Sequence, residues 1–133
     1  MPNDLQSAGQ AIAGDPRVLA VWGFGSQARG EAGAASDLDL AVLLDREISL
    51  ADELRLRSRV TEALRRDDVD LVVLNSAPPL LRYEVVAAGR RLFARDEEAA
   101  DRFEERAMRE CFDTAYLRQV QRDLSRRSRE VRA

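Results

Sequence analysis

Gly25-Ser26-Gln27-Ala28-Arg29-Gly30 … Ser36-Asp37-Leu38-Asp39 is the stretch that decides the fold of this chain. It holds a Gly-Ser pair, ten intervening residues and two aspartates separated by one residue. A mostly apolar run at residues 18–24 precedes it and predicts a buried strand. Residues 37–44 begin by alternating and end apolar, which predicts a second strand. Because side chains alternate along a strand, Asp37 and Asp39 should point to the same face.

The two aspartates indicate a metal site. Two carboxylates on one strand face repel each other unless a cation lies between them, and Mg²⁺ prefers hard oxygen ligands together with substrate phosphates. Two-metal phosphoryl transfer uses such a pair. Asp70, which lies at the start of an otherwise apolar strand at residues 69–74, is the candidate for a third carboxylate. A single acidic pair is more often only solvated, so the prediction depends on the ordered set of motifs.

The Gly-Ser pair indicates a phosphate site. Backbone N–H groups converge at a helix N-terminus, and glycine allows a phosphate to approach them closely. Gly25 and Ser26 follow the first strand and supply that geometry, the Ser26 hydroxyl adds a donor, and Arg29 could add positive charge. Taken alone, such a pair is more often a strand-to-helix turn with Ser26 as the N-cap.

Composition narrows the available chemistry. All 21 basic residues of this 133-residue chain are Arg, and both Lys and His are absent. This excludes Schiff-base and Walker-type lysines, His-based triads and His-ligated metals. The formal net charge of -3 argues against a dedicated nucleic-acid-coating protein. Carboxylates, Arg, Ser and a bound metal remain as catalytic groups.

Nothing in the sequence predicts export or membrane insertion. Residues 1–14 lack the basic start of a signal peptide, and no apolar run approaches the roughly 20 residues that span a bilayer. The single cysteine forms no internal disulfide, which fits a reducing compartment. We therefore expect a cytoplasmic protein without a membrane partner.

The rest of the chain predicts an α/β (α+β) domain. The expected helices are residues 5–13, 50–66, 79–88 and 96 onward. The expected fourth strand is residues 91–94, a candidate for the edge of the sheet. We expect a small mixed sheet of about four strands with helices on one face and the carboxylates exposed on the other. Residues 1–133 should form one domain, with residues 96–133 as a helical extension.

The first two strands should be antiparallel neighbours. Gly23-Phe24-Gly25-Ser26-Gln27-Ala28 formally fits a dinucleotide-binding pattern. Such a unit needs a crossover helix of a dozen or so residues between parallel strands. Only ten residues separate Ser26 from the second strand, and they include two glycines. The dinucleotide fold is therefore rejected.

The predicted C-terminal helix carries an apolar stripe and a split charge. The stripe consists of Met108, Phe112, Ala115, Tyr116, Val120 and Leu124. Residues 96–113 contain eight acidic residues and three Arg, whereas residues 114–133 contain six Arg and two acidic residues. The sequence does not decide whether this helix packs on its own domain or on a partner.

The ordered motifs resemble the signature of the DNA polymerase β-like nucleotidyltransferases. The string from Gly25 to Val42 is similar to the minimal nucleotidyltransferases, as are Val69-Asp70-Leu71-Val72 and the segment from Asn75 to Phe93. The MntA-type antitoxin branch is the best match. The resemblance covers about residues 16–95.

That resemblance implies a Mg²⁺-dependent adenylyltransferase that uses ATP. MntA-type proteins neutralise a HEPN-type toxin RNase, HepT, by attaching AMP to a toxin tyrosine. Carried over by position, Gly25 and Ser26 would hold the triphosphate, with Arg29 as a further phosphate-side candidate. Asp37 and Asp39 would bind Mg²⁺, and Asp70 would be the third carboxylate and the general base. A hetero-oligomer with the toxin is expected, without direct nucleic-acid binding.

Two alternatives stay open at the level of the sequence. The chain could transfer a nucleotide to a small-molecule hydroxyl, although 133 residues leave little room for the additional substrate domain that such enzymes usually carry. It could also be a binding antitoxin without catalysis, for which the charged last helix would be the interface. The number of AMP groups, the nucleotide preference and the oligomeric state are not determined by the sequence.

Overall fold

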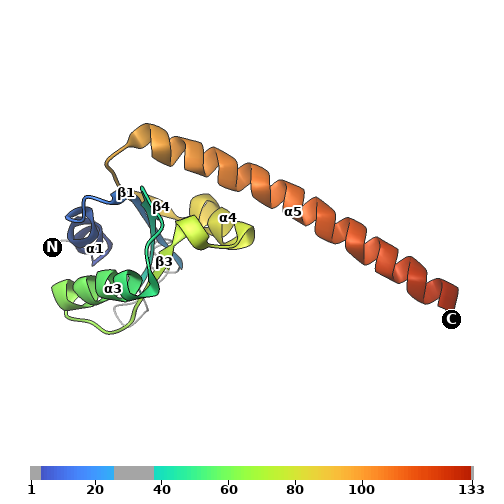
Figure 1. The fold of residues 1–133 in the computed structure, drawn as a ribbon, viewed down its shortest axis with the longest axis horizontal. Helices are drawn as coiled ribbons and strands as arrows, with labels where there is room; N and C mark the ends of the chain where they lie inside the picture. The colour runs from blue at the N-terminus through green and yellow to red at the C-terminus, as the bar shows by residue number, and fades with distance from the viewer. Residues whose placement is uncertain (1–3, 26–37, 133) are drawn as a thin grey trace.

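The computed structural model describes residues 4–25 and 38–132, which form a small sheet flanked by helices and extended by one long helix (Figure 1). The elements are α1 Asp4–Ala13, β1 Val18–Phe24, β2 Leu38–Leu44, α3 Leu50–Leu64, β3 Val69–Val73, the 3-10 turn η1 Leu74–Ser76, α4 Pro79–Ala88, β4 Arg90–Ala94 and α5 Glu97–Arg132. The sequence also predicts the start of a short helix at Ser26 and a loop at residues 30–35, and both lie outside the described residues.

The four strands form one mixed sheet in the order β3-β2-β1-β4. β1 pairs antiparallel with both β2 and β4, whereas β2 and β3 are parallel. The parallel pair is possible because α3 supplies the crossover between its strands. The predicted fold class, the antiparallel pairing of the first two strands and the edge position of β4 are confirmed.

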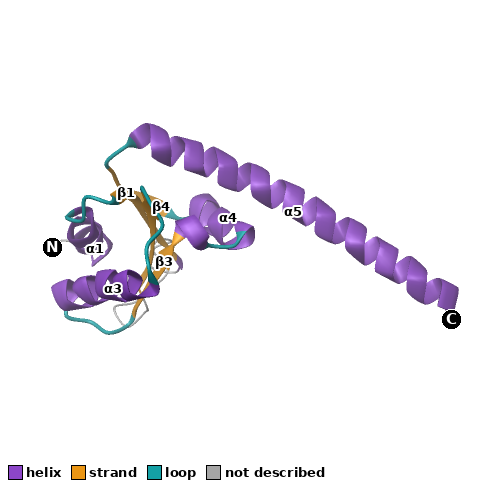
Figure 2. Cartoon of the chain, in the orientation of Figure 1, coloured by secondary structure: helices purple, strands orange, loops and turns teal. Residues whose placement is uncertain are grey.

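Helices cover both faces of the sheet, whereas we expected helices on one face and exposed carboxylates on the other. α1 and α3 lie on one side in Figure 2 and α4 and α5 on the other. The first core joins Leu5 and Ile12 of α1 to Leu40 of β2 and Leu56 of α3. The second core lies on the other face, between β1, β2, η1, α4 and α5. Its buried residues are Ala20, Trp22, Ala41, Leu74, Val85, Ala100, Phe103 and Ala107. Because β1 and β2 are apolar on both faces, both faces need a cover.

Local signals define the helix ends. Ser49 caps α3 by accepting a hydrogen bond from the Asp52 N–H at 3.2 Å. We predicted that this helix reaches Arg66, but it ends at Leu64, because Arg65 adopts the left-handed conformation with φ 54°. That conformation turns the chain toward β3. Pro79 opens α4 as predicted.

A glycine at the start of β4 and a buried aspartate before β1 fix the positions of these strand ends. A Cβ at Gly89 would lie 2.9 Å from the carbonyl oxygen of Gly23 and would also collide with that of Val85, so only glycine lets β4 begin beside β1. Asp15, in the turn before β1, is 3% exposed. The Arg17 side chain donates to both of its carboxylate oxygens, at 3.0 and 2.7 Å. These hydrogen bonds lower the pKa of Asp15 to about 2, against an ordinary value of 3.8.

α5 is 36 residues long, and its described contacts with the domain come from its first part. The Trp22 indole N–H donates to Glu104 at 3.0 Å, and Arg91 Nη2 pairs with the same carboxylate at 2.9 Å. Farther along, Arg82 Nη1 pairs with Glu110 at 3.2 Å. The rest of α5 runs past α4 and away from the domain (Figures 1 and 2).

Within the described residues, no helix is both long enough and apolar enough to cross a membrane.

Candidate active site

The candidate active site lies where β2 and β3 begin and β1 ends. Asp39 of β2 is the register partner of Asp70 of β3 in the parallel pair and of Phe24 of β1 in the antiparallel pair. Residues directly opposite each other on neighbouring strands point to the same face, and the strands lie about 4.8 Å apart. The two carboxylates therefore project side by side where β2 and β3 begin, at one end of the sheet. Asp39 is half-buried and Asp70 is exposed.

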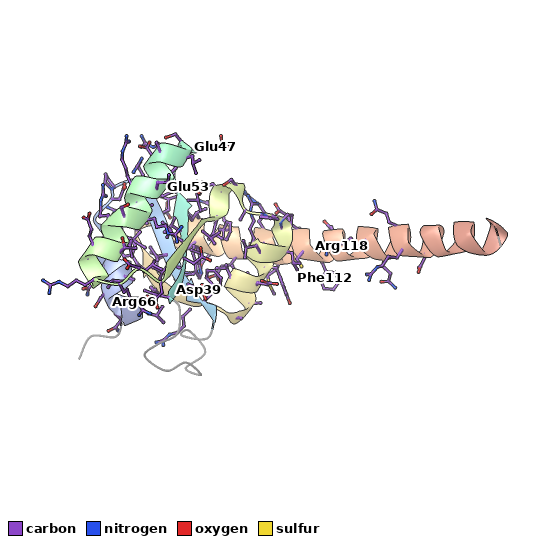
Figure 3. All side chains as sticks on the ribbon, turned by 90° about the horizontal axis from the view of Figure 1, so that it is seen from below. Asp39, Glu47, Glu53, Arg66, Phe112 and Arg118 are labelled. Atoms are coloured by element: carbon purple, nitrogen blue, oxygen red, sulfur yellow. The ribbon has the colours of Figure 1, made fainter. Side chains whose placement is uncertain are left out.

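This face of the sheet also carries the second core. Ala41 follows Asp39 by one strand period and is buried under α4 and α5, and Val72 stands in the same relation to Asp70. The apolar residues hold the strands under the helices, whereas the acidic residues lie at the strand ends. The sequence pattern therefore places the carboxylates at the end of a buried surface. Figure 3 labels Asp39 on the sheet.

Arg66 and Asp68 brace the start of β3. Arg66 Nε and Nη2 donate to the two carboxylate oxygens of Asp68, both at 2.6 Å. The hydrogen bonds from Arg66 hold the pKa of Asp68 below its usual range. The Asp68 carbonyl accepts a hydrogen bond from the Leu38 N–H at 2.9 Å. This bond fixes the register that sets Asp70 opposite Asp39. Sequence reasoning missed the brace, although Arg-x-Asp directly before a strand is a visible signal.

Gly25 comes directly after β1 and touches this site. Its φ is +75°, a value that glycine adopts far more readily than other residues. A Cβ built on it would lie 3.2 Å from Cγ of Asp39 and would overlap one carboxylate oxygen. The backbone therefore turns against the Asp39 carboxylate at a distance that only glycine permits. This close approach brings the start of the Gly-Ser turn to the acidic pair.

The other predicted site residues are not placed. Ser26, Arg29 and Asp37 lie outside the described residues, so their roles stay predictions. In the described part of the chain, no group of three or more acidic, His or Cys side chains is arranged to hold a metal. Asp39 and Asp70 are brought together, and the third carboxylate of the predicted set is Asp37.

Two hollows described elsewhere on the surface do not include the acidic pair. One of about 550 Å³ lies between α1 and β4 and is lined by residues that include Gln6, Gln10 and Leu92. The other, of about 180 Å³, lies at the opposite end of β3 beside Glu47 and Asn75. Neither combines a carboxylate pair with a glycine turn, so the candidate site rests on register and chemistry.

Comparison with known proteins assigns the domain. The family "Polymerase beta, Nucleotidyltransferase" matches residues 7–98, which include Gly25, Asp39 and Asp70. The chain belongs to this nucleotidyltransferase family. The protein adenylyltransferase MntA of Shewanella oneidensis is 32% identical over 83 residues, 62% of this chain and 59% of that protein. The match thus spans about three fifths of the length of this curated relative.

Solved structures of toxin–antitoxin complexes share the fold. A chain from a toxin–antitoxin crystal structure with AMP-PNP superposes with a TM-score of 0.77 at 26% identity, covering 92% of this chain and 97% of that one. A chain from a mutant toxin–antitoxin complex of MntA gives 0.75 at 25% identity, covering 86% and 91%. The likeness therefore extends over nearly the whole length of those chains.

The carboxylate pair suits the cation that this family uses. Polymerase β-type nucleotidyltransferases typically work on a nucleoside triphosphate with a divalent metal. Carboxylate oxygens are the hard ligands that such a cation prefers, and Asp39 and Asp70 present them from neighbouring strands. The residues present therefore fit a divalent cation.

Proposed function

We propose that this chain is an antitoxin adenylyltransferase, which transfers AMP from ATP to a tyrosine hydroxyl of a HEPN-type toxin RNase and so neutralises the toxin. The observation that carries the proposal is the pairing of Asp39 with Asp70 beside the turn at Gly25. The similarity to the adenylyltransferase MntA supports AMP as the transferred group. The likeness to an antitoxin fold crystallised with its toxin and an ATP analogue supports the partner class.

In the proposed reaction, binding and orientation of ATP come first. The backbone N–H groups at Gly25 and Ser26 hold the triphosphate, and Arg29 adds a positive charge on the phosphate side. Asp37, Asp39 and Asp70 would hold Mg²⁺. When bound, that cation neutralises the charge that develops on the pyrophosphate. The protein's own contribution is to fix the α-phosphorus in line with the incoming hydroxyl.

Asp70 is the proposed general base. It is exposed, so a tyrosine of a partner can reach it, and it lies on the same face as Asp39. Asp70 takes the proton of the tyrosine hydroxyl while the phenolic oxygen forms a bond to the α-phosphorus. The bond from this phosphorus to the pyrophosphate breaks, which gives AMP-tyrosine and pyrophosphate. The reaction needs ATP and a folded toxin, which places it in the cytoplasm.

The test is a transfer assay with purified proteins. The chain is incubated with the HEPN-type toxin of the adjacent gene, ATP labelled at the α-phosphate, and Mg²⁺ or Mn²⁺. We expect label on the toxin, and mass spectrometry should show the added mass of AMP on a tyrosine peptide. Asp39→Asn and Asp70→Asn should abolish the label. Glu62→Gln is the matched control, because Glu62 is an exposed carboxylate on α3.

The outcomes separate the alternatives. Label on the toxin that disappears with Asp39→Asn, while the toxin still binds, supports the proposal. Full neutralisation of the toxin by Asp39→Asn would identify an antitoxin that acts by binding alone. An unlabelled toxin together with pyrophosphate release in the presence of a small hydroxyl compound would identify a small-molecule enzyme.

A further inference from the structure

α5 has a buried inner face and, on its opposite side, an outer face whose described side chains are exposed. The inner face is buried at Ala100, Phe103 and Ala107. Phe112 follows Phe103 by nine residues, about two and a half helical turns, so it lies on the opposite side of the helix. Its side chain is 82% exposed, and that of Met108 is 48% exposed. Figure 3 shows Phe112 on the part of α5 that leaves the domain.

The sequence along this outer face is self-complementary. Its positions, spaced by three or four residues, are Glu105, Arg109, Phe112, Tyr116, Val120, Asp123 and Arg127, and we call them the outer seam. The seam has an apolar centre and charged ends. Reversed about position 116, it places Glu105 opposite Arg127, Arg109 opposite Asp123 and Phe112 opposite Val120. Every charged position of the seam then faces the opposite charge.

We propose that the outer seam pairs with the same seam of a second copy of this chain, with the two α5 helices antiparallel and position 116 on the two-fold axis. An isologous contact of this kind needs a self-complementary surface, and the seam is one. A parallel pair would instead place each charge opposite its own kind, which is unfavourable. Positions 105 to 127 cover about 33 Å of helix, long enough for several turns of contact.

The anchoring of α5 leaves the described side chains of the seam accessible: Glu105, Arg109, Phe112 and Asp123 are exposed. The contacts to Trp22, Arg91 and Arg82 come from Glu104 and Glu110, which lie outside the seam. Glu105, Arg109 and Asp123 are exposed and take part in none of the ion pairs found between described residues. A second helix can therefore dock without breaking a contact of the domain.

A charge exchange tests the proposal in the full chain. The mass of the purified protein is followed by sedimentation over a concentration series, without toxin or nucleotide. We expect a dimer, and Arg109→Glu or Asp123→Arg alone should weaken its association about tenfold or more, because each creates two like-charge contacts. The double variant should restore the dimer. Arg118→Glu, on the opposite side of the helix, is the matched control and should leave it unchanged.

Cysteine pairs test the direction of the helices. In a Cys111→Ser background, Tyr116→Cys should form a disulfide-linked dimer under mild oxidation, because position 116 faces itself. Val120→Cys should not, because position 120 faces position 112 of the other copy. Crosslinking of both variants would indicate a parallel pair and overturn the register.

A chain that stays monomeric at every concentration would overturn the proposal. If the seam variants then weaken only binding of the toxin, the outer seam is a toxin-binding surface and not a dimer interface. The readout is mass and crosslinking, so a failure of the proposed AMP transfer would leave this result unaffected.

Discussion

Replacing Gly25 by alanine should separate catalysis from folding. The new Cβ would overlap a carboxylate oxygen of Asp39 and would lie 3.2 and 3.4 Å from its Cγ and Cβ atoms. Either the Asp39 side chain must rotate away from the position that faces Asp70, or the turn must move. In addition, a φ of +75° costs a residue with a side chain about 1–2 kcal/mol.

The two effects have different sizes in different assays. Strain of about 1–2 kcal/mol should lower the melting temperature by several degrees and leave the chain folded. A displacement of a reacting group by about 1 Å can cost about 100-fold in rate. We therefore expect Gly25→Ala to lose about 100-fold or more in AMP transfer to the toxin, measured with labelled ATP. Circular dichroism would establish that the variant is folded.

Gly14→Ala is the matched control. Gly14 is exposed, and a Cβ there would meet its nearest atom, the carbonyl oxygen of Ala11, at an ordinary 3.6 Å. Its transfer rate should equal that of the wild-type chain. If folded Gly25→Ala transfers AMP within about twofold of the control, the approach of this glycine to Asp39 does not position the site and our reasoning is wrong.

Three further changes probe the acidic pair and the framework. Asp39→Asn and Asp70→Asn should each lower AMP transfer about 100-fold or more, while a pull-down still recovers the toxin; an active variant would remove that carboxylate from the mechanism. Because the folded pKa of Asp15 is about 2 against 3.8, its ion pairs should stabilise the fold by about 2 kcal/mol above pH 3.8 and lose this as the pH falls toward 2. Urea unfolding across that range should show the loss, and Asp15→Asn should flatten it. Trp22→Phe removes the donor to Glu104 and should cost about 1–2 kcal/mol in urea unfolding; an unchanged midpoint would show that this bond contributes nothing to stability.

The strands of the site could be predicted because their signals are local. The apolar run before Gly25 and the alternation after Asp37 each define a strand without tertiary information. The position of Asp70 at the start of an apolar run predicted that it belongs to the same sheet. The register that sets it opposite Asp39 could not be predicted, because it depends on the Leu38–Asp68 hydrogen bond and the Arg66 brace, which join segments distant in sequence.

The cover of the second face was harder to predict. The carboxylates suggested an open face, yet Trp22 and Ala41 on that same face are buried. On this face only the ends of the strands are uncovered. The alternation of side chains shows which residues share a face, but it does not show where along the strand the cover ends. The apolar stripe along α5 likewise did not show whether its side chains are buried or exposed, because both kinds of stripe have the same residue spacing. The structure shows that Phe112 protrudes.

The parallel pairing of β2 with β3 has a consequence for the order of events in a cell. Asp39 and Asp70 come together only after α3 has closed the crossover between their strands, and contacts of high sequence separation form late and slowly in folding. A nascent chain that ends before β3 has no assembled acidic pair. The proposed nucleotidyl transfer therefore requires synthesis and docking of β3, so an assembled acidic pair reports that β2 and β3 have paired, whether or not β4 has joined the sheet.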